Sequence, residues 1–503
     1  MSLLTAPHIE NYRTTARRSG FLTIFVCILS CFVQLAVAQD PPEFVRAGAA
    51  TSNITPELGG EIIGGFLPIP AKQIHDELHA RCLVLDDGKT QLALVVCDLL
   101  GIHRSLSLEA RRQIQEATGI PPEHVMISAT HTHSATSAIS NASVVRNYQA
   151  DMPLNDYQKF VARRISDGVR RAIQNLQPAE IAFGTVDVPE HLFNRRWFLK
   201  PDTMPVNPFG KVDQVKMNPP ANSPDLLEPA GPIDPTLSFI AIRSPNAQLL
   251  SLFSAYSLHY VGDVGPGHIS ADYFGIYCNR LQQQLSSPST DPPFVAMLAN
   301  GTSGDLNNIS FAKPRASRPT YGQMTYVAED LAAKVSAAIP NLKWSKKPVL
   351  AARYRELDLK WRDVDGELMT WSNETLATAP ALQGTDLSMI YARRVQELAK
   401  ASPETKAPVQ LLRIGDIAIG TSPCETFAEI GLEFRKRSPF PHSFMVELAH
   451  GYYGYLPTPR HFELGGYETW PGTNYLEPQA SEKIMSALLE MADEVQKESN
   501  LTN

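Results

Sequence analysis

The sequence has no strong excess of charge of either sign, and this limits the classes of protein that it can encode. Among 503 residues, 45 are Lys or Arg and 52 are Asp or Glu, so the formal net charge at pH 7 is −7. Proteins that bind nucleic acid usually carry a basic face, and the mild acidic balance therefore argues against a nucleic-acid partner. Hydrophobic residues make up 43% of the chain and charged residues 19%, which excludes a largely disordered protein.

Cysteine is scarce, with six residues in the whole chain. Two of them fall in an apolar N-terminal segment, and the other four are widely spaced: Cys82, Cys97, Cys278 and Cys424. Their spacing does not match the CxxC pairs of zinc and redox sites, and so few cysteines cannot form a disulfide scaffold. A single disulfide among the four stays open.

Long apolar runs are absent except near the N-terminus, where residues 21–38 follow two arginines and end in Ala-Val-Ala. A positive start, an apolar core and a small-x-small end are typical of a secretory signal peptide. We therefore expect residues 1–38 to be a cleaved signal and the protein to be secreted or periplasmic. The alternatives are an uncleaved membrane anchor, since 18 residues approach the length of a membrane span, lipid attachment at Cys31, and peripheral contact with a membrane.

Strand-like runs alternate with helical periodicity along the rest of the chain. The predicted strands are residues 81–85, 91–97, 125–129, 180–188, 249–258, 294–298 and 411–420. The predicted helices are residues 106–118, 157–176 and 481–498. This alternation favours an α/β fold.

Residues 201–235 contain nine prolines and show little periodicity. Such a segment is either a lid-like loop or a disordered spacer. Because no low-complexity bias accompanies the prolines, we expect an ordered excursion and not a linker between domains.

A histidine pair is the sharpest chemical feature of the sequence. His131 and His133 stand in Ser-Ala-Thr-His-Thr-His-Ser (residues 128–134), directly after an apolar run. On an extended segment, residues i and i+2 point to the same face, so the two imidazoles can converge on one site. Imidazole pairs at this spacing suit zinc. The alternative is a pair of hydrogen-bonded loop histidines.

Other ligand-type residues also follow predicted strands. His259 closes the run 249–258, and Glu425 follows the run 411–420 after a short connection. Sites in α/β sheets collect outside the carboxyl ends of strands, so ligand-type residues at three strand ends favour a metal site there. A tyrosine-rich segment at 450–458 is, by itself, more typical of packing or of an interface.

Taken together, these segments resemble the neutral/alkaline non-lysosomal ceramidase family. The shared motifs, in the order of the family, are residues 128–134, Asn194-Arg195, His259, Glu425-Thr426-Phe427, and the Tyr-Gly-Tyr-x-x-Thr segment that begins at Tyr453 and runs on to Tyr467-Glu468. Residues 60–66 and 79–81 also look like the opening strands of that family. The resemblance covers about residues 45–475.

The resemblance implies a zinc site with four protein ligands: His131, His259, Glu425 and Tyr455. It implies further residues that hold and polarise the scissile amide: His133, Arg195 and Tyr467. Such a site activates a water molecule for attack, and an arginine can stabilise the oxyanion. The implied activity is that of a zinc-dependent amidohydrolase that cleaves the linear amide C–N bond of ceramide or of a related N-acyl lipid.

The sequence departs from the family pattern in three places. The serine of the family's Gly-Asp-x-Ser-Pro-Asn is replaced by Asn307, so we expect zinc-activated water to attack directly, without a covalent acyl-enzyme at that position. Residues 135–137 are Ala-Thr-Ser where the family has Gly-Pro-Gly. We also expect the family's C-terminal β-sandwich domain to be missing.

These observations predict an α/β fold with one large catalytic domain, residues 45–498, because the implied ligands extend from residue 131 to residue 455. In this fold, mixed β-sheets are flanked by helices, and the metal site lies at the C-terminal ends of strands. Two other functions stay open: a zinc hydrolase that acts on another amide or an ester, and a non-catalytic lipid- or glycan-binding protein on the same scaffold.

Overall fold

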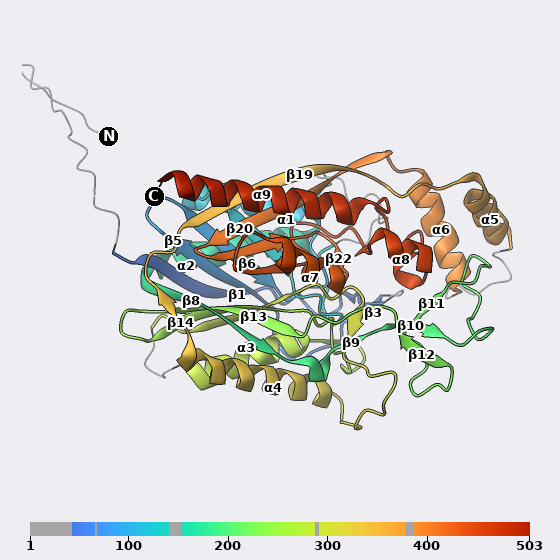
Figure 1. Ribbon diagram of the computed structural model, residues 1–503, viewed down its shortest axis with the longest axis horizontal. Coiled ribbons are helices and arrows are strands. Elements are labelled where there is room, and N and C mark those ends of the chain that lie inside the picture. Colours follow the sequence, from blue (N-terminus) through green and yellow to red (C-terminus); the bar gives the residue numbers. More distant parts are fainter. Residues whose placement is uncertain (1–42, 66–67, 140–151, 287–290, 379–385, 503) are drawn as a thin grey trace, which may run out of the picture. The chain divides into compact units, whose positions relative to one another are not determined.

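A large mixed β-sheet runs through the computed structural model, which describes residues 43–65, 68–139, 152–286, 291–378 and 386–502 (Figure 1). Most strand pairs in this sheet are antiparallel, and the last pair at each edge is parallel. Within the described residues its path is β16 (Val295–Asn300), β14 (Leu249–Tyr256), β13 (Thr236–Arg243), β8 (Gln177–Asp187), β1 (Val45–Asn53), β5 (His79–Asp86), β6 (Gln91–Cys97) and β7 (Val125–Ala129), with β18 (Trp344–Ser345) paired to β8.

A smaller sheet packs against one face of the large sheet. Its strands are β19 (Leu350–Lys360), β20 (Glu404–Ile414), β21 (Ile417–Thr421) and β23 (His442–Val446). Leu83 and Leu85 of the large sheet share one buried cluster with Ile417 and Ile419 of the small sheet. Because side chains alternate between the faces of a strand, every second apolar residue enters this core between the sheets.

Helices cover the outer faces of both sheets. Helices α1 (Arg104–Thr118) and α2 (Asp156–Gln174) pack on one half of the large sheet, and α3 (Asp272–Leu285) and α4 (Gly322–Ala338) pack on the other half. Helices α7 (Ala428–Arg437) and α9 (Ala480–Thr502) cover the small sheet, and α9 runs along β19 and β20 (Figure 1). The remaining helices are α5 (Gly366–Ala377), α6 (Leu387–Ala399) and α8 (Pro459–Leu464).

Short strand pairs lie near the ends of the main strands. They are β2 (Glu61–Ile62) with β3 (Ile69–Pro70), β4 (Gln73–Ile74) with β15 (His268–Ile269), β9 (Phe193–Asn194) with β17 (Leu306–Asn307), and β22 (Glu425–Thr426) with β24 (Tyr455–Leu456). The last pair places Glu425 directly opposite Tyr455.

The predicted α/β fold, with mixed sheets flanked by helices, is confirmed. The predicted strands 81–85 and 91–97 are β5 and β6, which pair as a hairpin, and α1 is followed by Gly119, whose φ of 80° suits glycine at a helix C-terminus. The single strand predicted at 411–420 is wrong, because Gly415 (φ 63°) reverses the chain between β20 and β21. The four widely spaced cysteines are all free.

The proline-rich arm, residues 201–235, is ordered as predicted. Its strands β11 (Val215–Met217) and β12 (Leu226–Pro229) flank β10 (Arg196–Leu199). The arm is fixed beside the short helix η6 (Tyr467–Thr469), since the indole nitrogen of Trp470 donates to Asp213 at 2.9 Å.

The predicted signal, residues 1–38, lies outside the described residues. The described residues belong to one compact unit. No helix in the part of the chain that the structure describes is both long and apolar enough to cross a membrane.

Candidate metal centre

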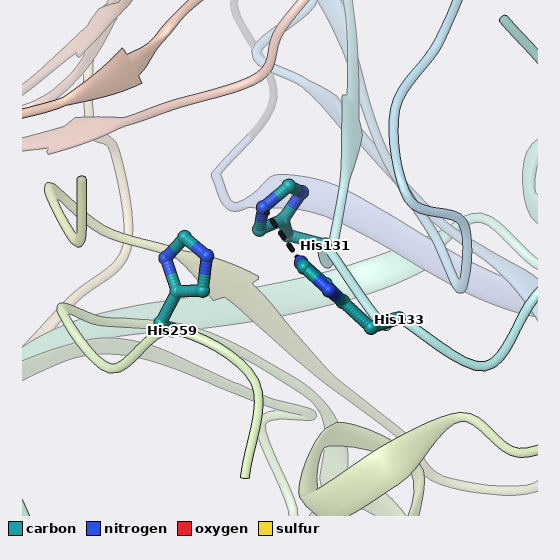
Figure 2. Close-up of side chains that lie close together, drawn as sticks. All are labelled: His131, His133 and His259. Atoms are coloured by element: carbon teal, nitrogen blue, oxygen red, sulfur yellow. Dashed lines mark hydrogen bonds between the residues drawn. The ribbon is translucent and has the colours of Figure 1, made fainter. Parts of the chain in front are cut away.

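Three strand ends deliver ligand-type side chains to one place. His131 follows β7, His259 follows β14, and Glu425 follows β21, all at the C-terminal ends of these strands. His131, His133 and His259 each offer a nitrogen atom, and these atoms lie within 4.8 Å of one another (Figure 2). This cluster of three imidazoles could hold a metal ion.

His131 reaches the site through a turn and not through an extended segment. Its φ is 70°, in the left-handed region, so the extended geometry predicted for the histidine pair is wrong at this residue. The turn forms because its backbone N–H donates to the carbonyl of Leu99 at 2.9 Å and its Nδ1 lies 2.7 Å from the carbonyl oxygen of Leu100. His133 still converges, with its Nε2 3.2 Å from Nε2 of His131.

His259 is fixed from behind by Ser303. Its Nδ1 lies 3.2 Å from both the carbonyl oxygen and Oγ of Ser303. A carbonyl oxygen can only accept, so the proton resides on Nδ1 and Nε2 carries a lone pair. That Nε2 is buried and has no hydrogen-bond partner among the described residues. Burial, and then the neighbouring His131, lower the pKa of His259 well below its usual value, which keeps the ring neutral.

Glu425 supplies a negative charge to the same site. Its Oε2 lies 3.3 Å from Nε2 of His131 and 3.7 Å from Nε2 of His259. Burial raises the pKa of this carboxyl, but His131 and hydrogen bonds from His131, Tyr452 and Tyr455 outweigh burial and lower the pKa to about 2. The Glu425 carboxylate and Nε2 of His259 therefore face one another in a buried space beside His131, and this donor set fits a divalent cation.

Tyr455 and Arg195 form the side of the site beyond Glu425. Burial raises the pKa of Tyr455 well above its usual value, so its phenol is protonated and donates to Glu425. The guanidinium carbon of Arg195 lies 5.3 Å from the centre of the Tyr455 ring. The centres of the Tyr455 and Tyr467 rings lie 5.8 Å apart. Arg195 donates from Nε to Glu468 at 2.9 Å and from a terminal nitrogen to the carbonyl of Gly304 at 2.7 Å.

A cavity of about 610 Å³ opens onto these side chains. Every residue that the sequence analysis named for the site lines it: His131, His133, Arg195, His259, Glu425, Tyr455 and Tyr467. The proline-rich arm contributes a second wall that includes Met204, Val206 and Met217. Ile63 and Leu100 add further apolar surface.

Sequence reasoning missed two aromatic neighbours of the ligands. The Tyr452 hydroxyl donates to Oε1 of Glu425 at 2.6 Å, and the Tyr260 ring stacks on His133 with ring centres 3.7 Å apart. Each stands close in sequence to a predicted site residue, and that proximity was the available signal.

Asn307, at the position of the family's serine, is not among the residues that line the cavity. Its side-chain nitrogen donates to the side-chain oxygen of Asn218 at 2.9 Å. Asn218 does line the cavity, so Asn307 supports the arm from outside.

The comparison with protein families identifies the chain. The family model for neutral/alkaline non-lysosomal ceramidase, N-terminal, matches residues 46–317, which is more than half of the sequence. The chain belongs to this ceramidase family. It is 24% identical over 360 residues to the neutral ceramidase of Pseudomonas aeruginosa, and the match covers 69% of this chain and 48% of that protein. The chain therefore spans about half the length of that ceramidase.

Solved ceramidase structures share the fold. The crystal structure of the neutral ceramidase from Pseudomonas aeruginosa superposes with a TM-score of 0.67 at 19% identity, covering 92% of this chain and 75% of that chain. A ceramidase complexed with C2 gives a TM-score of 0.67 at 18% identity, covering 91% and 76% of the two chains.

Proposed function

We propose that this member of the ceramidase family is a zinc-dependent amidohydrolase that cleaves the N-acyl amide of ceramide or of a related N-acyl lipid. The observation that carries the proposal is the convergence of three imidazoles and the Glu425 carboxylate beside a buried arginine, inside a cavity with apolar walls. Membership of the ceramidase family supports the same reaction class.

In this proposal His131, His259, Glu425 and Tyr455 hold the zinc ion. When bound, zinc lowers the pKa of a water ligand toward ~7 and polarises a carbonyl group. The buried Nε2 of His259, which lacks a hydrogen bond among the described residues, and the anionic Glu425 support this set. Tyr455 hydrogen-bonds to Glu425, and it would lose its proton on binding the metal.

Three further residues act on the substrate in this proposal. Arg195 stays charged, because Tyr455 and Glu468 outweigh the effect of burial and raise its pKa well above the usual value. A fixed guanidinium that lines the cavity can stabilise the oxyanion that develops on the amide carbonyl. Burial, and then His131, lower the pKa of His133 well below its usual value, so this ring is neutral and able to accept a proton. Tyr467 lines the cavity, and its hydroxyl can donate a hydrogen bond that holds and polarises the amide.

The chemistry of the cavity walls supports an acyl substrate. Apolar side chains on the arm and at Ile63 and Leu100 offer a surface for an acyl chain, while charged and hydroxyl groups gather at the ligands. We also propose that residues 45–498 form the catalytic domain and that residues 1–38 direct the chain out of the cytosol.

Zinc removal combined with a substrate panel tests the proposal. Purified protein is assayed against ceramides, short N-acyl amines and simple esters, before and after chelation and after zinc is restored. We expect about one zinc ion per chain and amide hydrolysis that disappears and returns with the metal. Equal turnover by zinc-free protein contradicts the metal mechanism. Turnover of esters alone identifies a different hydrolase, and tight lipid binding without turnover identifies a binding protein.

A further inference from the structure

Glu447 is a fully buried carboxyl group that lies outside the cavity and directly after β23. Its Oε2 accepts from the backbone N–H of Ser303 at 3.2 Å and from the backbone N–H of Thr426 at 2.6 Å. Its Oε1 accepts from the hydroxyl of Ser303 at 2.6 Å. These three donors favour the charged form of Glu447, but burial outweighs them and raises the pKa of this carboxyl well above its usual value.

Through Ser303, Glu447 reaches the back of His259. Both donors of Ser303, its N–H and its O–H, are taken by Glu447, so its carbonyl oxygen and the free lone pair of its hydroxyl face Nδ1 of His259. Two acceptors at 3.2 Å hold the proton on Nδ1 and direct the lone pair of Nε2 into the site.

Through Thr426, Glu447 also fixes the segment that carries Glu425. Thr426 is the second residue of β22, and its backbone N–H donates to Glu447. Both residues are fully buried. The backbone N–H of Glu447 in turn donates to the carbonyl of Asn300 at 3.1 Å, at the end of β16. One buried carboxyl group therefore connects the supports of two candidate ligands.

We propose that Glu447 is a positioning residue of the metal centre, acting through Ser303 on His259 and through Thr426 on Glu425. The inference rests on the proposed function, because it concerns the metal that this function requires. Hydrogen-bonding partners behind metal ligands set their orientation and basicity, and their loss typically weakens metal affinity by about 10–100-fold.

Three variants test the inference. Glu447→Gln keeps the shape of the side chain but places an amide N–H₂ against one of the donors of Ser303 or Thr426. Ser303→Ala removes the hydroxyl and leaves the carbonyl in place. Asp86→Asn is the matched control, because Asp86 is another buried carboxylate that accepts hydrogen bonds. Its donors are Gly88 at 2.8 Å and Gln91 at 3.1 Å, at the turn of the β5–β6 hairpin.

Zinc affinity is measured by competition with a chelator, and the geometry of the site is followed in the visible absorption spectrum of the Co²⁺-loaded protein. We expect Glu447→Gln to weaken zinc binding by about 10–100-fold and to change the cobalt spectrum. Loss of one hydrogen bond in Ser303→Ala should weaken binding by about fivefold, and Asp86→Asn should match the wild type. If Glu447→Gln does not fold, Ser303→Ala decides.

Zinc affinities within about twofold of the wild type in Glu447→Gln and Ser303→Ala, with unchanged cobalt spectra, would overturn this inference and leave the proposed function intact. Failure of the wild-type chain itself to bind zinc would overturn both.

Discussion

Glu468 balances two buried guanidinium groups beside the candidate metal centre, and its removal should be costly. Its carboxylate accepts from Nε of Arg195 at 2.9 Å and from Arg196 at 2.6 Å. The side-chain exposures are 0% for Glu468, 6% for Arg195 and 0% for Arg196, so water cannot take over these contacts.

The size of the effect follows from this burial. Removing one partner of a buried ion pair leaves an uncompensated charge and costs about 3–5 kcal/mol. Glu468→Ala leaves the two buried guanidinium groups without their shared carboxylate. We therefore expect the free energy of unfolding to fall by at least about 3–5 kcal/mol. Arg195 keeps its bond to Gly304 but loses the partner of Nε, and kcat should drop because the oxyanion donor is misplaced.

Glu329→Ala provides the control. Glu329 pairs with Arg280 at 2.8 Å, but the two side chains are 50% and 40% exposed, and exposed pairs contribute about 0–1 kcal/mol. Urea unfolding followed by circular dichroism gives both free energies. Equal, small losses for the two variants would refute the reasoning that burial makes the Glu468 contacts strong.

The pH dependence provides a second check on Glu468. Burial raises the pKa of its carboxyl, but Arg196 and Arg195 outweigh burial and lower the pKa below its ordinary value of 4.5. A lowered folded-state pKa means that the stabilisation is present above pH 4.5 and is lost as the pH falls through the folded-state value. The stability difference between wild type and Glu468→Ala should therefore shrink below pH 4.5 in unfolding curves. A constant difference would contradict this assignment.

Further predictions concern the ligands and a close backbone approach. His259→Ala should abolish zinc binding and amide hydrolysis, whereas Asn307→Ala should retain both. Zinc analysis and turnover assays check this pair. A zinc-loaded but inactive Asn307→Ala variant would show that Asn307 has a direct role in the reaction. A Cβ on Gly64 would lie 2.2 Å from the backbone oxygen of His133, while a Cβ on Gly65 meets nothing within 4 Å. Gly64→Ala should thus lower kcat by about 10²-fold through displacement of His133, and Gly65→Ala should leave kcat unchanged. Equal kcat values for the two variants would show that the close approach of Gly64 to His133 does not position His133 for the reaction.

Local pattern predicted much of the fold. Strand-like runs identified several strands that enter the core between the sheets, and helical periodicity identified α1. The β20–β21 hairpin was missed because a continuous apolar run does not show a reversal at one glycine. Packing of the small sheet on the large one depends on contacts between residues far apart in sequence, which periodicity does not contain.

At the site, residue type and family motif identified the side chains, but not their supports. His131 reaches the centre because the backbone carbonyls of Leu99 and Leu100 hold its turn. Every residue has a backbone carbonyl, so the sequence does not indicate which ones make these contacts. Glu447 and Ser303 are ordinary residues in sequence, and only the meeting of distant strand ends places them behind a ligand. Tyr452 appeared as one of several tyrosines, and its bond to Glu425 emerged from the three-dimensional arrangement.

Anomalous diffraction at the zinc absorption edge, on crystals of the active protein, tests the central claim most directly. The account predicts one peak within about 2.0–2.2 Å of ligand atoms from His131, His259, Glu425 and Tyr455. Active protein without a zinc peak at these side chains, or with zinc bound elsewhere, would contradict it.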